Sequence, residues 1–429
     1  MITPTIALLI ASAVAPSPHH KFGLTEAMPR VDGTIRVGSY NMLDFFDQEN
    51  DPSLEGKYDD FGDNPGPTSL ERCEELAKMI RKLDADVLAL QEIESLEALK
   101  WFNSKFLSGM GYKCASKDVE YYRGIEQSVL SRFPITNIIT WENADLTKIE
   151  RVGGGWTDIP SDRDEISFQR SPLCVTVATP GGYKLTLFIV HQKSGRNAWH
   201  RELESLQIMQ YINDMVERNP NRNIMVIGDF NAQPWDRSLR VYFRDGMTDA
   251  LSIRALNIDW DDLSPLRKTH TSDRMLDFIL LNPAAMGEYV IDSGFVLGSS
   301  SQEYDWMNEP PPSGYASDHC AISIDLVPRE GMGHTVQATK WPDSATKTAL
   351  SSSPPSPKQP RLASPTNAPE PAAPDTAPFL ASKRSKVFHK ASCGNAKRIS
   401  EKNLTGYSSF SDASNAGKQP AKCCKPTAD

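Results

Sequence analysis

Short apolar runs with β character alternate with helical segments between residues 34 and 326, and this alternation restricts the fold more than any other feature. Strands are expected at residues 34–41, 86–92, 128–132, 173–178, 184–191, 223–229, 275–281 and 320–326. Two amphipathic helices are expected between them. The first opens with Thr68 and Glu71 at capping-box spacing, and the second spans residues 198–217. Strands and helices mixed at this density predict a layered α/β domain.

A proline-rich segment divides the chain into two parts. Residues 328–380 contain eleven prolines among Ser, Ala and Thr, a composition that cannot bury enough apolar surface to order itself. We therefore predict a disordered linker over residues 328–383. It separates a large domain at residues 30–327 from a small basic segment at residues 384–427.

The net charge of −9 is unevenly distributed. From residue 381 onward ten Lys and Arg stand against three Asp and Glu, a net +7, which leaves −16 for the residues before it. An acidic body would repel a polyanion as a whole. Contact with a polyanion is therefore expected at the basic tail or in a local groove.

The first residues resemble an export signal. "IALLIASAVA" at residues 6–15 is apolar and ends in Ala13-Val14-Ala15, the pattern of a signal-peptidase site. We predict a signal peptide over residues 1–15, a secreted or periplasmic protein, and no transmembrane segment, because this run is too short to span a bilayer. The alternative is a mildly apolar disordered start, since the first five residues lack Lys and Arg.

Six of the expected strands carry, near one end, a polar residue that a core strand does not need. These residues are Asn41, Glu92, His191, Asp229 with Asn231, Asp277, and Asp318 with His319. A single acid at a strand end is usually a turn former. Strands that share a direction bring their ends to one rim, and buried carboxylates gathered there require a cation. Mg²⁺ bound by oxygen ligands is the simplest candidate.

The segment "VIGDFNAQP" adds a detail to this rim. Asp229 and Asn231 are two residues apart, so alternation along a strand is expected to place both side chains on one face. Gly228 is expected to allow a neighbouring strand or a substrate to approach closely. A carboxylate and a carboxamide together suit recognition of phosphate.

The motifs "SYNML", "LALQEIE", "IVHQKSGR", "VIGDFNAQP", "MLDFILLN" and "SDHCAISI" resemble, in order, those of the endonuclease/exonuclease/phosphatase superfamily, especially its deoxyribonuclease-like members. The resemblance covers about 300 residues. It implies a four-layer sandwich in which two mixed β-sheets pack face to face with helices outside. It also implies hydrolysis of a phosphate ester by metal-assisted water, without a covalent intermediate.

The resemblance also implies ligands and a base. Glu92 is the principal Mg²⁺ ligand, with Asn41 and Asp318 completing the metal shell, and Mn²⁺ is the alternative ion. Asp229 orients or deprotonates the attacking water. Asn231 donates a hydrogen bond to a non-bridging phosphate oxygen.

The remaining implied roles concern the phosphate and the leaving group. Asp277 pairs with His319 and fixes its tautomer, so that the ring can hydrogen-bond the scissile phosphate. His191 lies beside the leaving oxygen, and Arg170, in "QRSP", contacts the phosphate. Glu126 is a further candidate, for orienting His191.

Nucleic acid, and DNA in particular, is the expected substrate of a monomeric enzyme. The stretch "HQKSGR" followed by "AWHRELE" resembles exported bacterial nucleases, and the tail is basic. One alternative is a phosphodiesterase or phosphatase of lipid or inositol head groups, with Trp156 or Trp306 on a membrane-facing loop. Another is a non-catalytic binding protein. No nucleotide cofactor is expected, because the sequence contains no phosphate-binding or dinucleotide-binding glycine loop.

The basic segment resembles the small Ada-like module appended to bacterial nucleases, which implies an α+β fold and a zinc site. His389, Cys393 and Cys424 are the candidate zinc ligands. Ala421 replaces one expected cysteine, and a disulfide between Cys393 and Cys424 is the alternative.

Four more cysteines lie in the large domain. Cys174 and Cys320 occupy strand-like runs and are expected to be core thiols. Cys73 and Cys114 could pair in an oxidising compartment.

Overall fold

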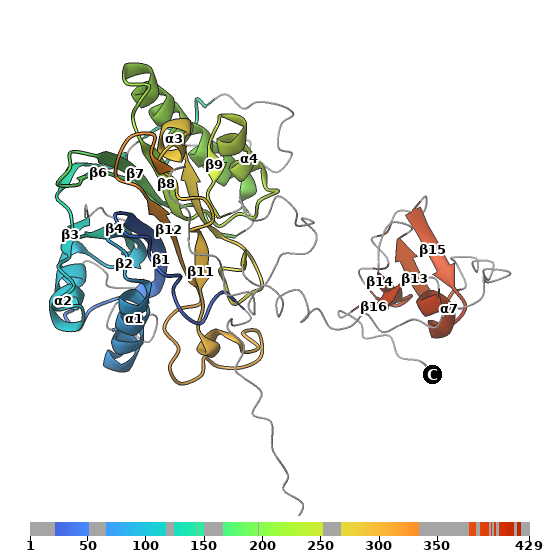
Figure 1. Ribbon diagram of the computed structural model, residues 1–429. Helices are drawn as coiled ribbons and strands as arrows, with labels where there is room; N and C mark the ends of the chain where they lie inside the picture. The colour runs from blue at the N-terminus through green and yellow to red at the C-terminus, as the bar shows by residue number, and fades with distance from the viewer. Residues whose placement is uncertain are drawn as a thin grey trace, which may run out of the picture. The chain divides into compact units, whose positions relative to one another are not determined.

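The structure is a computed structural model of the 429-residue chain (Figure 1). It describes residues 22–50, 66–116, 124–142, 144–149, 166–195, 197–251, 267–333, 377–382, 387–393, 396, 399, 403–415 and 418–421. The predicted signal peptide at residues 1–15 lies outside the described residues. The chain divides into two compact units, Met1–Ser352 and Ser353–Asp429.

The first unit contains two six-stranded sheets. One has the strand order β11 (Phe295–Leu297), β12 (Ala321–Leu326), β1 (Ile35–Phe45), β2 (Val87–Ile93), β4 (Glu126–Ser131) and β3 (Lys113–Ser116). In this sheet β1 and β2 run parallel, and the other neighbouring strands run antiparallel. It is therefore a mixed sheet.

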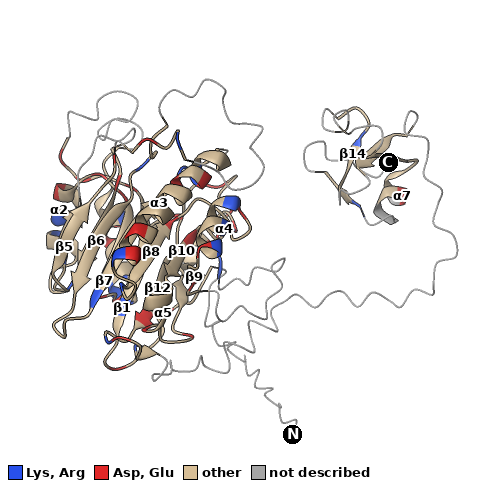
Figure 2. Cartoon of the chain, turned by 90° about the horizontal axis from the view of Figure 1, so that it is seen from above, with Lys and Arg blue, Asp and Glu red and all other residues tan. Residues whose placement is uncertain are grey.

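The second sheet has the order β5 (Ile135–Ile139), β6 (Leu173–Ala178), β7 (Lys184–His191), β8 (Ile224–Asp229), β10 (Asp277–Leu281) and β9 (Thr248–Asp249). Figure 2 shows these strands side by side. Here β7 and β8 run parallel, and the other pairs run antiparallel.

The two sheets pack face to face through a shared apolar core. Val37, Ala89 and Ile322 of the first sheet share one buried cluster with Leu187 and Ile227 of the second. Alternate residues of each strand point into this core, and the opposite faces pack against helices. The central layer therefore depends on apolar side chains from strands that lie far apart in sequence.

Helices cover both outer faces. Helices α1 (Leu70–Leu83) and α2 (Leu96–Phe106) pack on the first sheet, and α3 (Ala198–Arg218) and α4 (Arg237–Arg244) pack on the second. The short α5 (Pro283–Met286) and the 3₁₀ turn η4 (Ser300–Gln302) lie in connections. Four layers result, which confirms the predicted fold class.

The start of α1 differs from the expected capping box. Ser69 is the N-cap, and its hydroxyl accepts a hydrogen bond from the N–H of Arg72. The Thr68 hydroxyl instead accepts a hydrogen bond from the N–H of Phe46 at 2.9 Å. The tertiary contact to Phe46 occupies the Thr68 hydroxyl, so Ser69, not Thr68, caps the helix.

The described residues of the second unit form a small four-stranded sheet and one helix. Its strand order is β15 (Leu404–Tyr407), β13 (Phe379–Ser382), β14 (Val387–Lys390) and β16 (Gln419–Pro420), and α7 spans Phe410–Asn415. Phe379, Phe388 and Phe410 form its aromatic core. Strand β13 lies within the segment expected to be linker, so the ordered module begins before residue 384.

Within the part of the chain that the structure describes, no helix is both long and apolar enough to cross a membrane.

Candidate active site

Strand register in the second sheet places three of the predicted site residues at one level. His191 on β7 lies opposite Asp229 on β8, and Asp277 on β10 lies opposite Asp229 from the other side. Gly228 has a φ of 137°, and a Cβ atom there would collide with the carbonyl oxygen of Val190 on β7. The glycine therefore permits the close approach of the neighbouring strand, as the sequence predicted.

Asn41 and Glu92 come from the parallel strands β1 and β2 of the first sheet. The pairing advances from Asn41 opposite Gln91 to Phe45 opposite Ile93, so β1 carries extra residues at this point. Glu92 has a φ of 62°, which is unusual for a residue with a side chain. Such an irregularity redirects side chains, and backbone strain of this kind is concentrated at functional sites.

Two side chains connect the carboxylates of Glu92 and Asp229 across the two sheets. Asn41 Nδ2 lies 3.2 Å from Glu92 Oε1 and 3.3 Å from Asp229 Oδ2. His191 Nε2 lies 3.5 Å from each of the same two oxygens. The structure thus brings these four residues, which span 188 positions of sequence, to one point.

Asn231 is close to Asp229 for a different reason from the one expected. Strand β8 ends at Asp229, and Asn231 lies in a turn with a φ of 47°, so strand alternation does not relate the two side chains. The Asn231 N–H donates to Asp229 Oδ1 at 2.7 Å. Asn231 Nδ2 donates to Asp229 Oδ2 and to the Gln192 carbonyl, both at 3.1 Å. In this geometry Asn231 orients Asp229.

Burial and neighbouring charges set the ionisation of the two carboxylates. Burial raises the pKa of Asp229 to about 7. Burial acts in the same direction on Glu92, but the charges of His191 and Arg170 outweigh it and lower the pKa of Glu92 to about 2. A cation bound between the two groups would hold both in the charged form.

His319 is fixed by two carboxylates. Its Nδ1 donates to Asp277 Oδ2 at 2.8 Å, and its Nε2 lies 3.7 Å from Asp229 Oδ2. Burial would lower the pKa of His319, but Asp277 and Asp229 raise it well above the usual value. The ring is therefore positively charged at neutral pH and suited to contact an anion.

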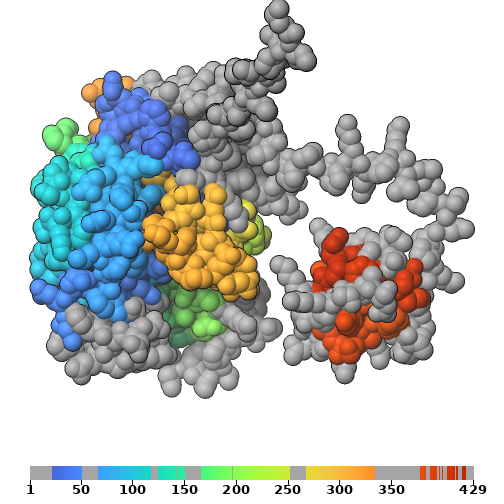
Figure 3. Space-filling model, turned by 90° about the horizontal axis from the view of Figure 1, so that it is seen from below, coloured from blue at the N-terminus to red at the C-terminus, as the bar shows by residue number. Residues whose placement is uncertain are grey.

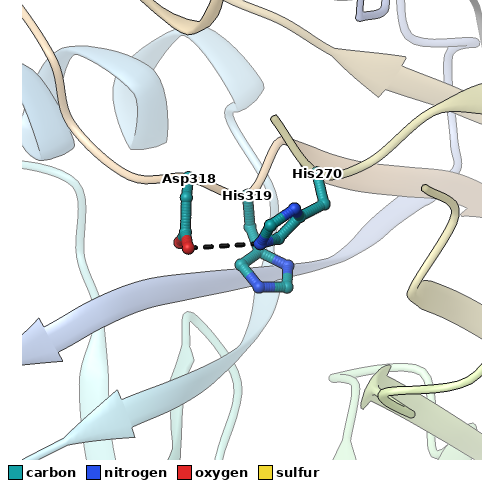
Figure 4. A group of neighbouring side chains, drawn as sticks. All are labelled: His270, Asp318 and His319. Carbon is teal, nitrogen blue, oxygen red and sulfur yellow. Dashed lines mark hydrogen bonds and ion pairs between the residues drawn. The ribbon is translucent and has the colours of Figure 1, made fainter. Parts of the chain in front are cut away.

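His270 is a site residue that the sequence analysis missed. Its Nε2 lies 3.2 Å from Asp318 Oδ2, and its ring packs edge-on against His319 with centroids 4.7 Å apart (Figure 4). No sequence spacing connects His270 with Asp318, which follows 48 residues later. An isolated β-bridge between His270 and His319 brings the segments together.

The hydrogen bonds of His270 define its role. The N–H of Ser272 donates to His270 Nδ1 at 2.9 Å, so Nδ1 is an acceptor and the neutral ring carries its proton on Nε2. Burial lowers the pKa of His270, which favours this neutral form. His270, Asp318 and His319 lie close enough together to surround an ion. The protonated Nε2 nevertheless makes His270 a donor that orients Asp318, not a metal ligand.

The carboxylate chemistry fits a divalent cation. Asp318 Oδ1 is buried and has no hydrogen-bond partner among the described residues, whereas Oδ2 accepts the bond from His270. Burial would raise the pKa of Asp318, but His270 and His319 lower it to about 2, so the carboxylate is charged. Glu92 Oε2 accepts the N–H of Asp44 at 2.7 Å, which fixes that side chain as well. Buried charged oxygens of this kind are the ligands that Mg²⁺ and Mn²⁺ prefer.

Arg170 and Glu126 are both buried in the first unit. Arg170 lines the same small pocket as His191, and its charge contributes to the lowered pKa of Glu92. Glu126 Oε2 accepts a hydrogen bond from Ser116 Oγ at 3.2 Å. Its role in orienting His191 stays a prediction.

An open cleft of about 450 Å³ lies beside the strand that carries Asn41. It is formed by the first turn of α1 and residues 311–315, and Figure 3 shows these two segments, light blue and orange, next to each other on one face. The half-buried guanidinium of Arg72 donates to the carbonyl groups of Met42, Leu43 and Ala316. Arg72 therefore ties the end of β1 to the segment that leads into Asp318.

The cysteine predictions have separate outcomes. Cys174 and Cys320 are buried core thiols, as predicted, and Cys73 and Cys114 are both free. In the second unit, His389 Nδ1 and Cys393 Sγ lie 3.7 Å apart. Cys424, the third candidate zinc ligand, lies outside the described residues.

Two packed mixed sheets, with carboxylates, imidazoles and an amide gathered at the ends of their strands, define a phosphoester hydrolase of the metal-dependent class. A family model described as Endonuclease/Exonuclease/phosphatase family matches residues 63–319, and the chain belongs to this family. It is therefore a metal-dependent hydrolase of the endonuclease/exonuclease/phosphatase type.

Solved structures similar to this chain include the human Nocturnin catalytic domain with bound sulfate anion, at 18% identity and a TM-score of 0.47, covering 70% of this chain and 97% of that one. Truncated Caenorhabditis elegans TDP2 is 16% identical with a TM-score of 0.44, covering 68% and 97%. A family protein from Bacteroides thetaiotaomicron is 18% identical with a TM-score of 0.43, covering 68% and 94%. No curated protein matches the sequence.

Proposed function

We propose that the protein is an exported Mg²⁺-dependent nuclease that hydrolyses phosphodiester bonds of nucleic acid, with DNA as its substrate. The observation that carries the catalytic part is the position of His191 Nε2, 3.5 Å from both Glu92 Oε1 and Asp229 Oδ2. This geometry supports Glu92 as a metal ligand, Asp229 as the base and His191 as a donor around one small space. Mn²⁺ is the alternative ion.

Glu92 and Asp318, with Asn41, would hold the cation. When bound, the ion supplies positive charge to the phosphate and makes an adjacent water more acidic. The ligand set rests on the charged, buried oxygens of Glu92 and Asp318.

The protein groups would then act on water and phosphate. Asp229 takes a proton from the attacking water, as a carboxylate whose pKa is raised to about 7 can do near neutral pH. His319, held by Asp277, donates a hydrogen bond to the scissile phosphate, and Arg170 contacts another oxygen of it. His191 supplies the proton that the leaving oxygen takes, so the products are a phosphomonoester and an alcohol.

Nucleic acid is proposed as the substrate on three features of the sequence. They are the export-like segment at residues 6–15, the basic tail, and the stretch "HQKSGR" with "AWHRELE". Zinc binding by His389, Cys393 and Cys424 in the basic module stays a prediction, as does a monomeric state.

A digest of circular and linear DNA and of RNA tests this function. Full-length protein stripped with EDTA should cut DNA only after Mg²⁺ or Mn²⁺ is restored, and Glu92→Gln should be inactive. Conversion of supercoiled plasmid to open circles would identify endonucleolytic cleavage. Failure of the wild-type protein to cleave any nucleic acid with either metal contradicts the proposal.

A lipid head-group phosphodiesterase is the second candidate, because two apolar side chains are exposed on one loop. Trp306 is 48% exposed and its neighbour Met307 is 74% exposed. Release of phosphate esters from phospholipid vesicles, without cleavage of DNA, would favour this candidate over the nuclease.

A further inference from the structure

We infer that Glu204, a residue of α3, is a positioning residue that fixes the backbone segments carrying Arg170 and His191. This rests on the proposed function only for the roles of those two residues. Glu204 lies on the helix packed against the second sheet, and its side chain is 1% exposed. A carboxylate buried this deeply requires partners that compensate its charge.

The two oxygens of Glu204 bind two separate segments of backbone. Oε1 accepts the N–H of Gln169 at 3.0 Å, and Oε2 accepts the N–H of Lys193 at 2.9 Å. Gln169 directly precedes Arg170, and Lys193 follows His191 by two residues. One carboxylate therefore joins the segments that carry both groups.

The spatial arrangement agrees with this function. Arg170, His191, Gln192 and Glu204 line the same small pocket. Figure 2 shows α3 lying over the strands β7 and β8. The carboxylate therefore acts from behind the phosphate-facing groups and need not touch a substrate.

Neighbouring residues of α3 reinforce the same connection. Arg201 Nη1 donates to the carbonyls of Lys193 and Gly195 at 2.9 and 2.8 Å. Ser205 Oγ accepts a hydrogen bond from Gln192 Nε2 at 2.9 Å. The first turns of α3 thus fix the whole loop after His191. Two residues of α3 also reach the segment before Arg170: Glu204 through the N–H of Gln169, and His200, whose Nε2 lies 2.8 Å from the Ser167 carbonyl oxygen.

Glutamate is required here because both backbone partners are donors, and His200 Nε2 lies a further 3.7 Å from Oε1. A glutamine has the same shape but only one acceptor oxygen, and its NH₂ group would face the second N–H. Glu204→Gln should therefore lose one of these two hydrogen bonds, and Glu204→Ala should lose both. Glu202 provides a matched control: it is buried on the same helix, but its carboxylate pairs with Arg237 at 3.0 Å.

The kinetic test compares Glu204→Ala, Glu204→Gln and Glu202→Gln with Mg²⁺ on bis(p-nitrophenyl) phosphate. Glu204→Ala should lower kcat by about 10- to 100-fold with little change in KM, because small displacements of phosphate-facing groups are costly. Glu204→Gln should lie between this variant and the wild type, and Glu202→Gln should retain nearly full activity. In a background that already carries Arg170→Ala and His191→Ala, Glu204→Ala should have little further effect. Equal losses in both backgrounds, or equal activity of the Glu204 and Glu202 variants, would overturn the inference.

A second readout separates this inference from the proposed function. In protein labelled with ¹⁵N-histidine, the His191 ring signals, assigned by their loss in His191→Ala, should move in Glu204→Gln and stay in place in Glu202→Gln. Unmoved signals in Glu204→Gln overturn the positioning role even if the protein is an active nuclease. Moved signals support the positioning role of Glu204 even if the wild type cleaves no nucleic acid. Absence of cleavage would overturn only the proposed nuclease function.

Discussion

The imidazole of His319 donates from Nδ1 to Asp277 Oδ2 across 2.8 Å, and this pair joins the segment before β12 in one sheet to β10 in the other. Both side chains are buried, so the bond is shielded from solvent. The charge on His319 therefore depends on the packing of the two sheets.

Replacement of Asp277 by Asn should reduce catalysis and shift its pH dependence. Asp277 raises the pKa of His319 well above its usual value, so loss of the carboxylate should move the alkaline limb of kcat/KM to lower pH. The rate at neutral pH should fall about 10²-fold or more. Asp325→Asn is a control, because Asp325 is equally buried but pairs with Arg36. An unchanged alkaline limb in Asp277→Asn would argue against the role of His319.

Glu92→Gln should abolish stabilisation by metal. Wild-type protein free of metal should gain about 2.7 kcal/mol of unfolding free energy when Mg²⁺ is present at about 100 times its dissociation constant. The variant should gain almost nothing in thermal unfolding. Glu94→Gln should respond as the wild type does, since Glu94 accepts the N–H of Asp47 instead. A normal Mg²⁺ response of Glu92→Gln would exclude Glu92 as the main ligand.

His270→Ala should weaken metal binding without removing a ligand. Loss of the donor to Asp318 leaves that carboxylate free to rotate, and removal of an orienting partner typically costs about 10- to 100-fold in metal affinity. Titration calorimetry with Mg²⁺ measures this directly. His270→Gln, which keeps an N–H donor, should lose less, and equal affinities for all three proteins would contradict the assigned role.

The metal-free protein should become less stable between pH 5 and pH 8. The folded pKa of Asp229, about 7, lies above the unfolded value of about 3.9, so the folded state binds the proton more tightly in between, and unfolding free energy falls as pH rises. His319, whose folded pKa is also raised, contributes stability that is fully present below about pH 6.5 and is lost as the pH rises through its folded pKa. The lowered pKa values of Glu92 and Asp318 affect the unfolding free energy mainly below about pH 5.

Urea unfolding with EDTA at the two pH values measures this difference, which should be roughly 1–4 kcal/mol. Mg²⁺ should remove most of it. Asp229→Ala should show a smaller difference than the wild type, and an increase of stability with pH in metal-free wild-type protein would show that these two groups do not dominate.

Asn231→Ala should lower the rate by about 10²-fold or more, as loss of an oriented donor does in other hydrolases. If the residue acts by orienting Asp229, the acid limb of the pH profile should also shift, because Asp229 loses the hydrogen bond from Asn231 Nδ2 and keeps only the one from the backbone N–H. A reduced rate with an unshifted acid limb would favour direct donation to phosphate instead.

Local sequence was sufficient for much of the fold. Continuous apolar runs identified strands such as β7 and β8, which are buried along nearly their whole length, and helical spacing identified α1 and α3. The short strands β5 and β9 were missed, because exposed or very short edge strands carry almost no pattern.

The sequence also indicated most members of the site, since residues such as Glu92 and Asp229 interrupt apolar strands at their ends. The expectation that strand alternation places Asn231 beside Asp229 was wrong. The contact depends on a left-handed turn that begins after β8, and hydrogen bonds to the Asp229 carboxylate stabilise that turn.

By itself, the sequence determined the strand and helix segments and the polar residues at strand ends, because apolar runs and helical spacing are local patterns. Its motifs carried the resemblance that implied the four layers. Only the tertiary structure decided that His270 orients Asp318 and that Glu204 joins the segments of Arg170 and His191. His270 and Asp318 lie 48 positions apart in the sequence. Glu204 contacts Gln169, 35 positions away, and Lys193, 11 positions away, in two separate segments. Local sequence patterns carry no information about such contacts.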